Sequence, residues 1–127
     1  MKYLLSSLML AGIVLLGACG GNEELTVDVV SDKTTLAVGE TIEFTIAVSS
    51  GDYDCGNWNV RKPDGASIAG ETGITASTSH TFSYTATEAG SFTFEYDAGY
   101  DCDENRVALG EIGKDIFRGT VDFTVTE

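Results

Sequence analysis

The sequence predicts an all-β domain built as a sandwich of two sheets. Apolar side chains recur at every second position through most of the chain after residue 24, which is typical of strands with one buried face. Turn-forming residues separate these runs at intervals of about eight to twelve residues, as in β-sandwiches. No segment after the N-terminal leader has apolar residues at helical spacing.

The first residues have the order of a secretory signal. Lys2 gives a positive start, residues 3–16 are almost wholly apolar, and small residues follow from Gly17. The apolar run is too short to span a bilayer as a stable helix. We therefore expect residues 1–18 to be removed after export.

The junction at Leu16, Gly17, Ala18 and Cys19 resembles the lipobox of bacterial lipoproteins. The resemblance implies cleavage before Cys19, which then carries the lipid. Several acyl chains hold a protein firmly on a bilayer, because each buried methylene contributes about 0.8 kcal/mol. Gly20 replaces the aspartate associated with inner-membrane retention in many Gram-negative bacteria, which favours the outer membrane and leaves the membrane face open. The alternative is an ordinary signal peptide with a cysteine here by chance.

Charge restricts the partners of the mature protein. The chain has a formal net charge of −13, which becomes −14 when Lys2 leaves with the signal. Such a charge repels nucleic acid phosphates and anionic headgroups, so we expect no nucleic-acid partner and contact with the bilayer through acylated Cys19. Residues 19–24 form a tether that reaches less than about 20 Å, and residues 25–127 form one domain.

The alternating runs define the expected strands, about six or seven in number. Their inward residues are Leu25, Val27 and Val29; Ile42, Phe44, Ile46 and Val48; Trp58 and Val60; Phe82, Tyr84 and Ala86; Phe92, Phe94 and Tyr96; and Val121, Phe123 and Val125. Turns are expected at 38–40, 63–65 and 88–90, where proline or glycine supports a tight reversal. A barrel is the alternative closure.

Four local features between about Leu25 and Thr126 carry a resemblance to a known fold family, and one of them is that the last strand ends the domain. Thr35, Leu36, Val38, Gly39, Glu40, Ile42 and Phe44 look like the start of strand B; Trp58 looks like the core tryptophan of strand C; His80, Phe82, Tyr84, Gly90, Phe92 and Phe94 look like the corner between strands E and F. In this order the residues resemble immunoglobulin-like domains of bacterial surface proteins, including the polycystic-kidney-disease (PKD) type. The resemblance implies a single immunoglobulin-like sandwich of about seven strands.

The sequence departs from antibody-type domains in two ways. Where those domains join strands B and F by a disulfide, this chain has Phe44 or Ile46 facing Phe94, so packing replaces the bridge. Phe92 stands where a tyrosine often forms the corner hydrogen bond, and it has no hydroxyl.

Cys55 and Cys102 are left as an even pair once Cys19 carries lipid. In an immunoglobulin-like sandwich the B–C and F–G loops emerge at the same end, and an exported protein meets an oxidising compartment. We therefore expect a disulfide between Cys55 and Cys102. Closing about 47 residues stabilises a fold by about 4 kcal/mol in the chain-entropy model.

The segments around these cysteines are acidic. A bridge would gather five carboxylates at one tip, namely Asp52, Asp54, Asp101, Asp103 and Glu104. Calcium binds six to eight oxygen ligands, and carboxylates can supply them. We therefore carry two expectations for this tip: the protein binds no cofactor, or it binds a calcium ion. The alternative to a calcium site is a solvated acidic rim.

Tyr53 and Tyr100 flank the same cysteines. Their flat faces could stack on a sugar ring or a partner side chain, and they could equally cover the disulfide. Trp58 is expected in the core. Residues 103–115 are long for a hairpin connection, and an extra strand, a helical turn and a flap are all compatible with their sequence.

The sequence lacks the parts of common active sites. His80 is the sole histidine, no Gly-x-Ser-x-Gly elbow is present, and residues 110–115 fail the P-loop pattern. We expect a non-catalytic, extracytoplasmic binding, adhesion or assembly module whose partner is another envelope or surface protein, or a glycan. The alternative is calcium-dependent binding of carbohydrate or another ligand at the loop tip, and an envelope hydrolase has the least support.

Overall fold

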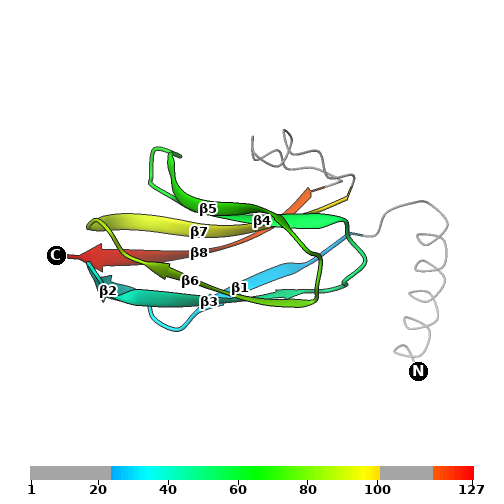
Figure 1. Cartoon of the computed structure of the whole chain (residues 1–127), viewed down its shortest axis with the longest axis horizontal. Coiled ribbons are helices and arrows are strands. Elements are labelled where there is room, and N and C mark those ends of the chain that lie inside the picture. Colours follow the sequence, from blue (N-terminus) through cyan, green and yellow to red (C-terminus); the bar gives the residue numbers. More distant parts are fainter. Residues whose placement is uncertain (1–23, 101–115) are drawn as a thin grey trace, which may run out of the picture.

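Two β-sheets packed face to face make up the part of the chain described in the computed structural model, residues 24–100 and 116–127 (Figure 1). The strands are β1 (Val27–Ser31), β2 (Thr35–Ala37), β3 (Thr41–Val48), β4 (Cys55–Arg61), β5 (Ser67–Ile74), β6 (Ser79–Thr85), β7 (Gly90–Gly99) and β8 (Ile116–Thr126). One sheet has the order β1-β3-β6 and the other has the order β2-β8-β7-β4-β5. The predicted all-β sandwich is confirmed.

The eight strands exceed the six or seven expected because two were not recognised in the sequence. β2 is only three residues long and pairs in parallel with β8, with Thr35 opposite Thr124. β5 lacks regular alternation, since Gly70 and Gly73 interrupt it and its pairing with β4 contains register shifts. Cys55, expected in a loop, is the first residue of β4.

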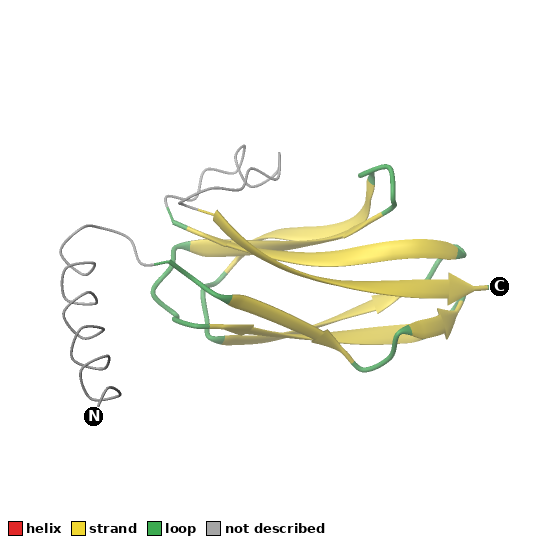
Figure 2. Cartoon of the chain, turned by 180° about the vertical axis from the view of Figure 1, so that it is seen from behind, coloured by secondary structure: helices red, strands yellow, loops and turns green. Residues whose placement is uncertain are grey.

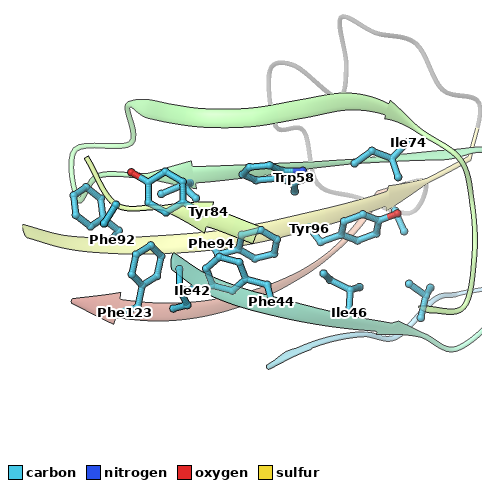
Figure 3. Close-up of a cluster of buried hydrophobic side chains, with 14 of the residues drawn as sticks. Ile42, Phe44, Ile46, Trp58, Ile74, Tyr84, Phe92, Phe94, Tyr96 and Phe123 are labelled. Atoms are coloured by element: carbon cyan, nitrogen blue, oxygen red, sulfur yellow. The ribbon is translucent and has the colours of Figure 1, made fainter. Parts of the chain in front are cut away.

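The core forms where the inner faces of the two sheets meet (Figure 3). The clearest alternation is in β3, whose four large apolar side chains are buried between exposed neighbours. Trp58 is 8% exposed and stacks on Phe94 with ring centroids 5.5 Å apart, which confirms it as a core residue. Val27, Val29, Phe82 and Val121 are partly buried against this cluster.

The expected turns are present at one end of the sandwich. Gly65 has φ of 93° and its N–H donates to the Lys62 carbonyl, as a tight turn between β4 and β5 requires. Gly39 has φ of 94° and its N–H donates to the Ala86 carbonyl. These contacts tie the segment before β3 to the segment after β6.

The N-terminal strand closes one side of the sandwich. β1 pairs with β3 and also packs against β8 of the other sheet. A Cβ on Gly119 would lie 2.5 Å from the Val27 carbonyl oxygen, so only glycine permits this approach. Among residues 24–100 and 116–127, the structure contains no helix with the length and apolarity needed to cross a membrane.

Candidate functional site

Two connections leave the sandwich at the same end, as the sequence predicts. β4 pairs with β7 so that Cys55 lies opposite Gly99, and the Asp54 N–H donates to the Gly99 carbonyl at 2.8 Å. The Cys55 thiol is not free, but Cys102 lies outside the described residues. The pairing of Cys55 with Cys102 therefore stays a prediction. We call the end formed by residues 49–54 and 99–100 the loop end.

The N-terminus of the domain enters at the loop end (Figure 2). Thr26 and Ser49 form two hydrogen bonds, in which the Thr26 N–H donates to Ser49 Oγ and the Ser49 N–H donates to the Thr26 carbonyl, both at 2.9 Å. Val27 is paired with Val48, the last residue of β3. Leu25 is buried and anchors this approach. The C-terminus lies at the opposite end, the far end (Figure 1).

Tyr53 does not offer a flat face to a ligand. Its side chain is buried at 5% exposure, and its hydroxyl donates to the Ser77 carbonyl at 2.7 Å and accepts from the Ser77 N–H at 3.0 Å. The same hydroxyl lies 3.0 Å from the Tyr96 hydroxyl. The expectation that Tyr53 stacks on a sugar or a partner therefore does not fit its position, because hydrogen bonds to residues remote in sequence draw the ring inward.

Tyr100 is also buried, at 7% exposure, and its ring meets Phe117 edge-on with centroids 6.4 Å apart. A ligand-stacking role for Tyr100 requires an exposed face, which this placement does not provide. The other interpretation of the two tyrosines, that they cover the disulfide, depends on the pairing of Cys55 with Cys102 and stays a prediction.

A polar cluster lies beneath the loop end. Tyr96 is fully buried, and burial raises the pKa of its phenol well above the usual value. His80 stacks on Phe82 and contacts Tyr96, and desolvation lowers the pKa of its imidazole. The Tyr96 hydroxyl sits where a side chain on Gly56 would be, so glycine is needed there. His80 is thus a packed, structural histidine.

The acidic residues of the predicted calcium site fall into two groups. Asp52 and Asp54 are exposed at the loop end, whereas Asp101, Asp103 and Glu104 lie outside the described residues. The described ranges contain no group of three or more side chains arranged to hold a metal ion. The calcium site stays a prediction, and so does any role of residues 103–115, which also lie outside.

A charged network covers the outer face of the five-stranded sheet. Arg118 donates to both carboxylate oxygens of Asp97, at 2.6 and 3.0 Å, and Arg61 donates to Glu95 at 2.7 Å. Arg118 also lies 3.4 Å from Glu95, which joins the two pairs. The carboxylates are on β7 at the centre of the sheet, and the arginines reach them from β8 and β4.

Both carboxylates are buried although they face away from the core. Glu95 is 6% and Asp97 is 2% exposed. Burial raises the pKa of Asp97, and the hydrogen bond to Arg118 opposes that rise. The sequence analysis missed this network. Glu95 and Asp97 alternate with Phe94 and Tyr96, which indicates an outward face, but their basic partners lie on other strands.

A hollow adjoins the same outer face near the far end. It has a volume of about 290 Å³ and is lined by Pro63, Ser91, Phe92, Thr93, Asp122, Phe123 and Thr124. Thr93 donates to Asp122 at 2.7 Å across its floor. The hollow is thus lined by both polar and aromatic residues, and it lies far from the loop end.

Two solved domains resemble this chain in structure. The PKD domain of an M14-like peptidase from an archaeon of the Thermoplasmatales matches with a TM-score of 0.53 and 16% identity, over 84% of this chain and 100% of that one. The fold is immunoglobulin-like and PKD-like. The CARDB domain of a Pyrococcus furiosus protein, solved in complex with di-metal ions, matches with a TM-score of 0.50 and 19% identity, over 84% of this chain and 95% of that one. No family model and no curated protein matches this sequence.

The PKD-like sandwich accounts for where the features of this chain lie. Its topology brings the B–C and F–G connections to one end, as Cys55 and Gly99 show. Phe44 and Phe94 occupy the expected inward positions of strands B and F and are stacked, so packing does replace the antibody-type bridge. The Tyr84 hydroxyl, near the E–F corner, is buried without a hydrogen-bond partner.

Proposed function

We propose that this chain is a lipid-anchored, non-catalytic binding module of the cell envelope, attached through Cys19 and stapled by a Cys55–Cys102 disulfide. The observation that carries the proposal is the fixed position of Thr26 against Ser49, which places the start of the domain at the loop end. If Cys19 carries lipid, as the lipobox predicts, the start of the domain is held close to the bilayer.

The short tether orients the domain. Residues 19–24 reach less than about 20 Å, so the loop end stands next to the bilayer and the far end points away from it. Asp52 and Asp54 are exposed at the loop end, so they would lie near the bilayer. The space between the loop end and the bilayer leaves little room for a large partner to dock.

The partner contact is best assigned to the outer face of the five-stranded sheet near the far end. This face combines the hollow at Pro63 and Asp122 with the partly exposed guanidinium of Arg61. Arginine is enriched in protein interfaces, so an envelope protein is the favoured partner and a glycan is the alternative. The outer membrane is the proposed location.

The proposed disulfide is supported by distance along the chain. Gly99 is paired with Cys55, and only two residues lie between Gly99 and Cys102 in the sequence. A bridge at this point closes the loop end without altering either sheet. Its expected contribution is about 4 kcal/mol.

Calcium-dependent binding is a second candidate function. It is favoured by one comparison, since the CARDB domain of similar fold was solved with di-metal ions. In this chain the ion would take Asp52 and Asp54 together with Asp101, Asp103 and Glu104. The melting temperature of the full chain should then rise by several degrees with Ca²⁺, and Asp101→Asn with Asp103→Asn should remove the rise. An unchanged melting temperature would contradict a calcium site.

The proposal is tested in cells that express the full chain. Cys19→Ala should abolish lipid labelling and release the protein from the membrane fraction, while Cys55→Ala keeps the label. For the partner, chemical cross-linking on intact cells should yield an adduct that Asp122→Arg weakens and Asp52→Arg leaves unchanged. An adduct lost with Asp52→Arg and kept with Asp122→Arg would contradict the assignment to the far end.

A further inference from the structure

Strand β6 is an open edge of the three-stranded sheet. Its register with β3 is regular from Ser79 to Thr85, with no bulge. Within the described ranges no other strand runs along it. Edge strands of this kind are usually guarded by charge, proline or a bulge, because they can pair with another chain. β6 contains no proline, lysine, arginine or acid.

The hydrogen bonds at its two ends show which backbone groups face outward. The Val48 N–H donates to the Thr78 carbonyl and the Ala86 N–H donates to the Glu40 carbonyl, both in register with β3 and β6. In an antiparallel ladder hydrogen-bonded pairs alternate, so even-numbered residues of β6 bond to β3. The N–H and C=O groups of the odd-numbered residues therefore point away from the sheet.

The outward backbone groups of one of these residues, Ser79, already have hydrogen-bond partners. Ser77 Oγ accepts from the Ser79 N–H at 3.2 Å and donates to the Ser79 carbonyl at 3.1 Å. The remaining outward residues are Thr81, Ser83 and Thr85, whose side chains are exposed. They present a short, regular row of donors and acceptors.

The other strand edges are better guarded. β1 is covered by its contact with β8 at Gly119, and β2 has only three residues. β5 is interrupted by register shifts against β4, by Gly73 with φ of 68° and by the charge of Glu71. β6 is thus the one long, regular and uncharged edge in the described part of the chain.

We propose that β6 pairs antiparallel with β6 of a second copy of this chain. A twofold axis at Ser83 would place Ser83 opposite its counterpart and Thr81 opposite Thr85 of the other copy. The two three-stranded sheets would join into one. Cross-strand threonine pairs are favourable in antiparallel sheets, and Thr41 and Thr85 already form one, with their hydroxyls 2.9 Å apart.

Within the described residues, the uncharged β6 edge is a place where two copies can meet without close acid–acid repulsion. Like charge keeps two chains of net charge −13 apart wherever acids meet. At the β6 edge the nearest acid on the same outer face is Glu43, on β3 beside Ser83. Across the paired edges the two Glu43 residues would be three strand spacings apart, about 14 Å, which exceeds the Debye length of about 8 Å in physiological salt.

Antiparallel pairing has a geometric consequence that rests on the proposed lipid anchor. The two Leu25 ends would lie at opposite ends of the dimer, since each marks the loop end of its own copy. Anchored upright, the paired copies would sit on facing membranes. Self-pairing at β6 would then be an adhesive contact.

Cysteine cross-linking of the full chain tests the pairing itself. Residues opposite one another in a hydrogen-bonded pair have Cα atoms about 5.5 Å apart, which suits a disulfide. Under mild oxidation Ser83→Cys should give a species of twice the monomer mass in most of the protein. Thr45→Cys, on the same face but one strand inside the edge, should remain monomeric, as should the unaltered chain. Thr81→Cys should also stay monomeric because its counterpart lies four residues away.

Three outcomes would overturn the proposal. They are a Ser83→Cys chain that stays monomeric, equal cross-linking of Ser83→Cys and Thr45→Cys, and a mixed disulfide with a different protein in place of the doubled mass. Adding Thr81→Lys and Thr85→Lys together to Ser83→Cys should reduce the doubled species at least several-fold, because positions 81 and 85 of the two copies are opposite one another and would carry like charges. Lipid labelling at Cys19 is measured on the same samples, so failure of the anchor and failure of the pairing are told apart.

Discussion

Phe44 and Phe94 stack across the two sheets, with ring centroids 4.0 Å apart and ring planes inclined by 14°. Both side chains are fully buried. Phe44 also contacts Phe123, and Phe94 also stacks on Trp58, so these four rings form a continuous aromatic cluster in the core. Aromatic pairs add about 0.5–1.5 kcal/mol to the effect of burial. This contact stands where antibody domains have a disulfide.

Phe94→Ala should therefore lower the free energy of unfolding by about 3–5 kcal/mol, because it removes a buried ring and leaves a cavity. Val30→Ala is the matched control, since Val30 is 61% exposed and the loss should stay within about 0.5 kcal/mol. Urea unfolding followed by tryptophan fluorescence measures both. Equal stability of the two variants would show that the stacked pair does not organise the core.

Arg118→Ala should cost about 3 kcal/mol, because Asp97 would remain buried without its bidentate partner. Lys62→Ala breaks the exposed pair with Glu88, at 3.5 Å, and should cost less than about 1 kcal/mol. Denaturant unfolding at pH 7 gives both values. A loss at Arg118 no larger than that at Lys62 would mean that solvent reaches Asp97.

Stability should fall when the pH drops from 8 to 6. Desolvation lowers the pKa of His80 below 6.5 in the folded state, so the unfolded chain takes up the proton first. The stabilisation is fully present above the unfolded pKa and is lost as the pH falls through 6.5 toward the folded pKa. His80 is the single histidine of the chain, so His80→Gln should flatten this part of the profile. An unchanged slope in that variant would assign the titration to another group.

Gly56→Ala should destabilise the fold by about 1–3 kcal/mol, because the added methyl overlaps the Tyr96 hydroxyl and displaces it from Tyr53. Gly51→Ala is the control, since its methyl would meet Thr78 at an ordinary 3.7 Å. Thermal unfolding of both variants measures the difference. Equal melting temperatures would indicate that Tyr96 can turn away at little cost.

Regular alternation made much of the fold predictable. In β3 and β7 the apolar residues at every second position identify the inner face without reference to the rest of the chain, and Phe44 and Phe94 follow from that pattern. β5 was not predicted because Gly70 contributes no side chain to the alternation and because the register with β4 shifts at residues 72–73 and at Ile68. The alternation of apolar residues therefore predicts a strand only where the strand has no bulge.

The site was less predictable because its contacts are distant in sequence. Tyr53 looks exposed in a polar loop, but Ser77 and Tyr96, 24 and 43 residues away, bind its hydroxyl inside the domain. In the sequence Asp97 has the position of a solvent-exposed residue, but in the structure Arg118 of the neighbouring strand donates a hydrogen bond to it. The position of Thr26 against Ser49 likewise depends on the fold, and under the proposed anchor at Cys19 it determines which end of the domain would face the bilayer.

The orientation at the membrane is tested most directly by fluorescence quenching. The full chain is labelled at Asp52→Cys or at Ala66→Cys, exposed positions at the loop end and the far end, in vesicles that carry a headgroup quencher. Anchoring at Cys19 with the loop end toward the bilayer predicts strong quenching at position 52 and little at position 66. Stronger quenching at position 66, or none at either position, would contradict it.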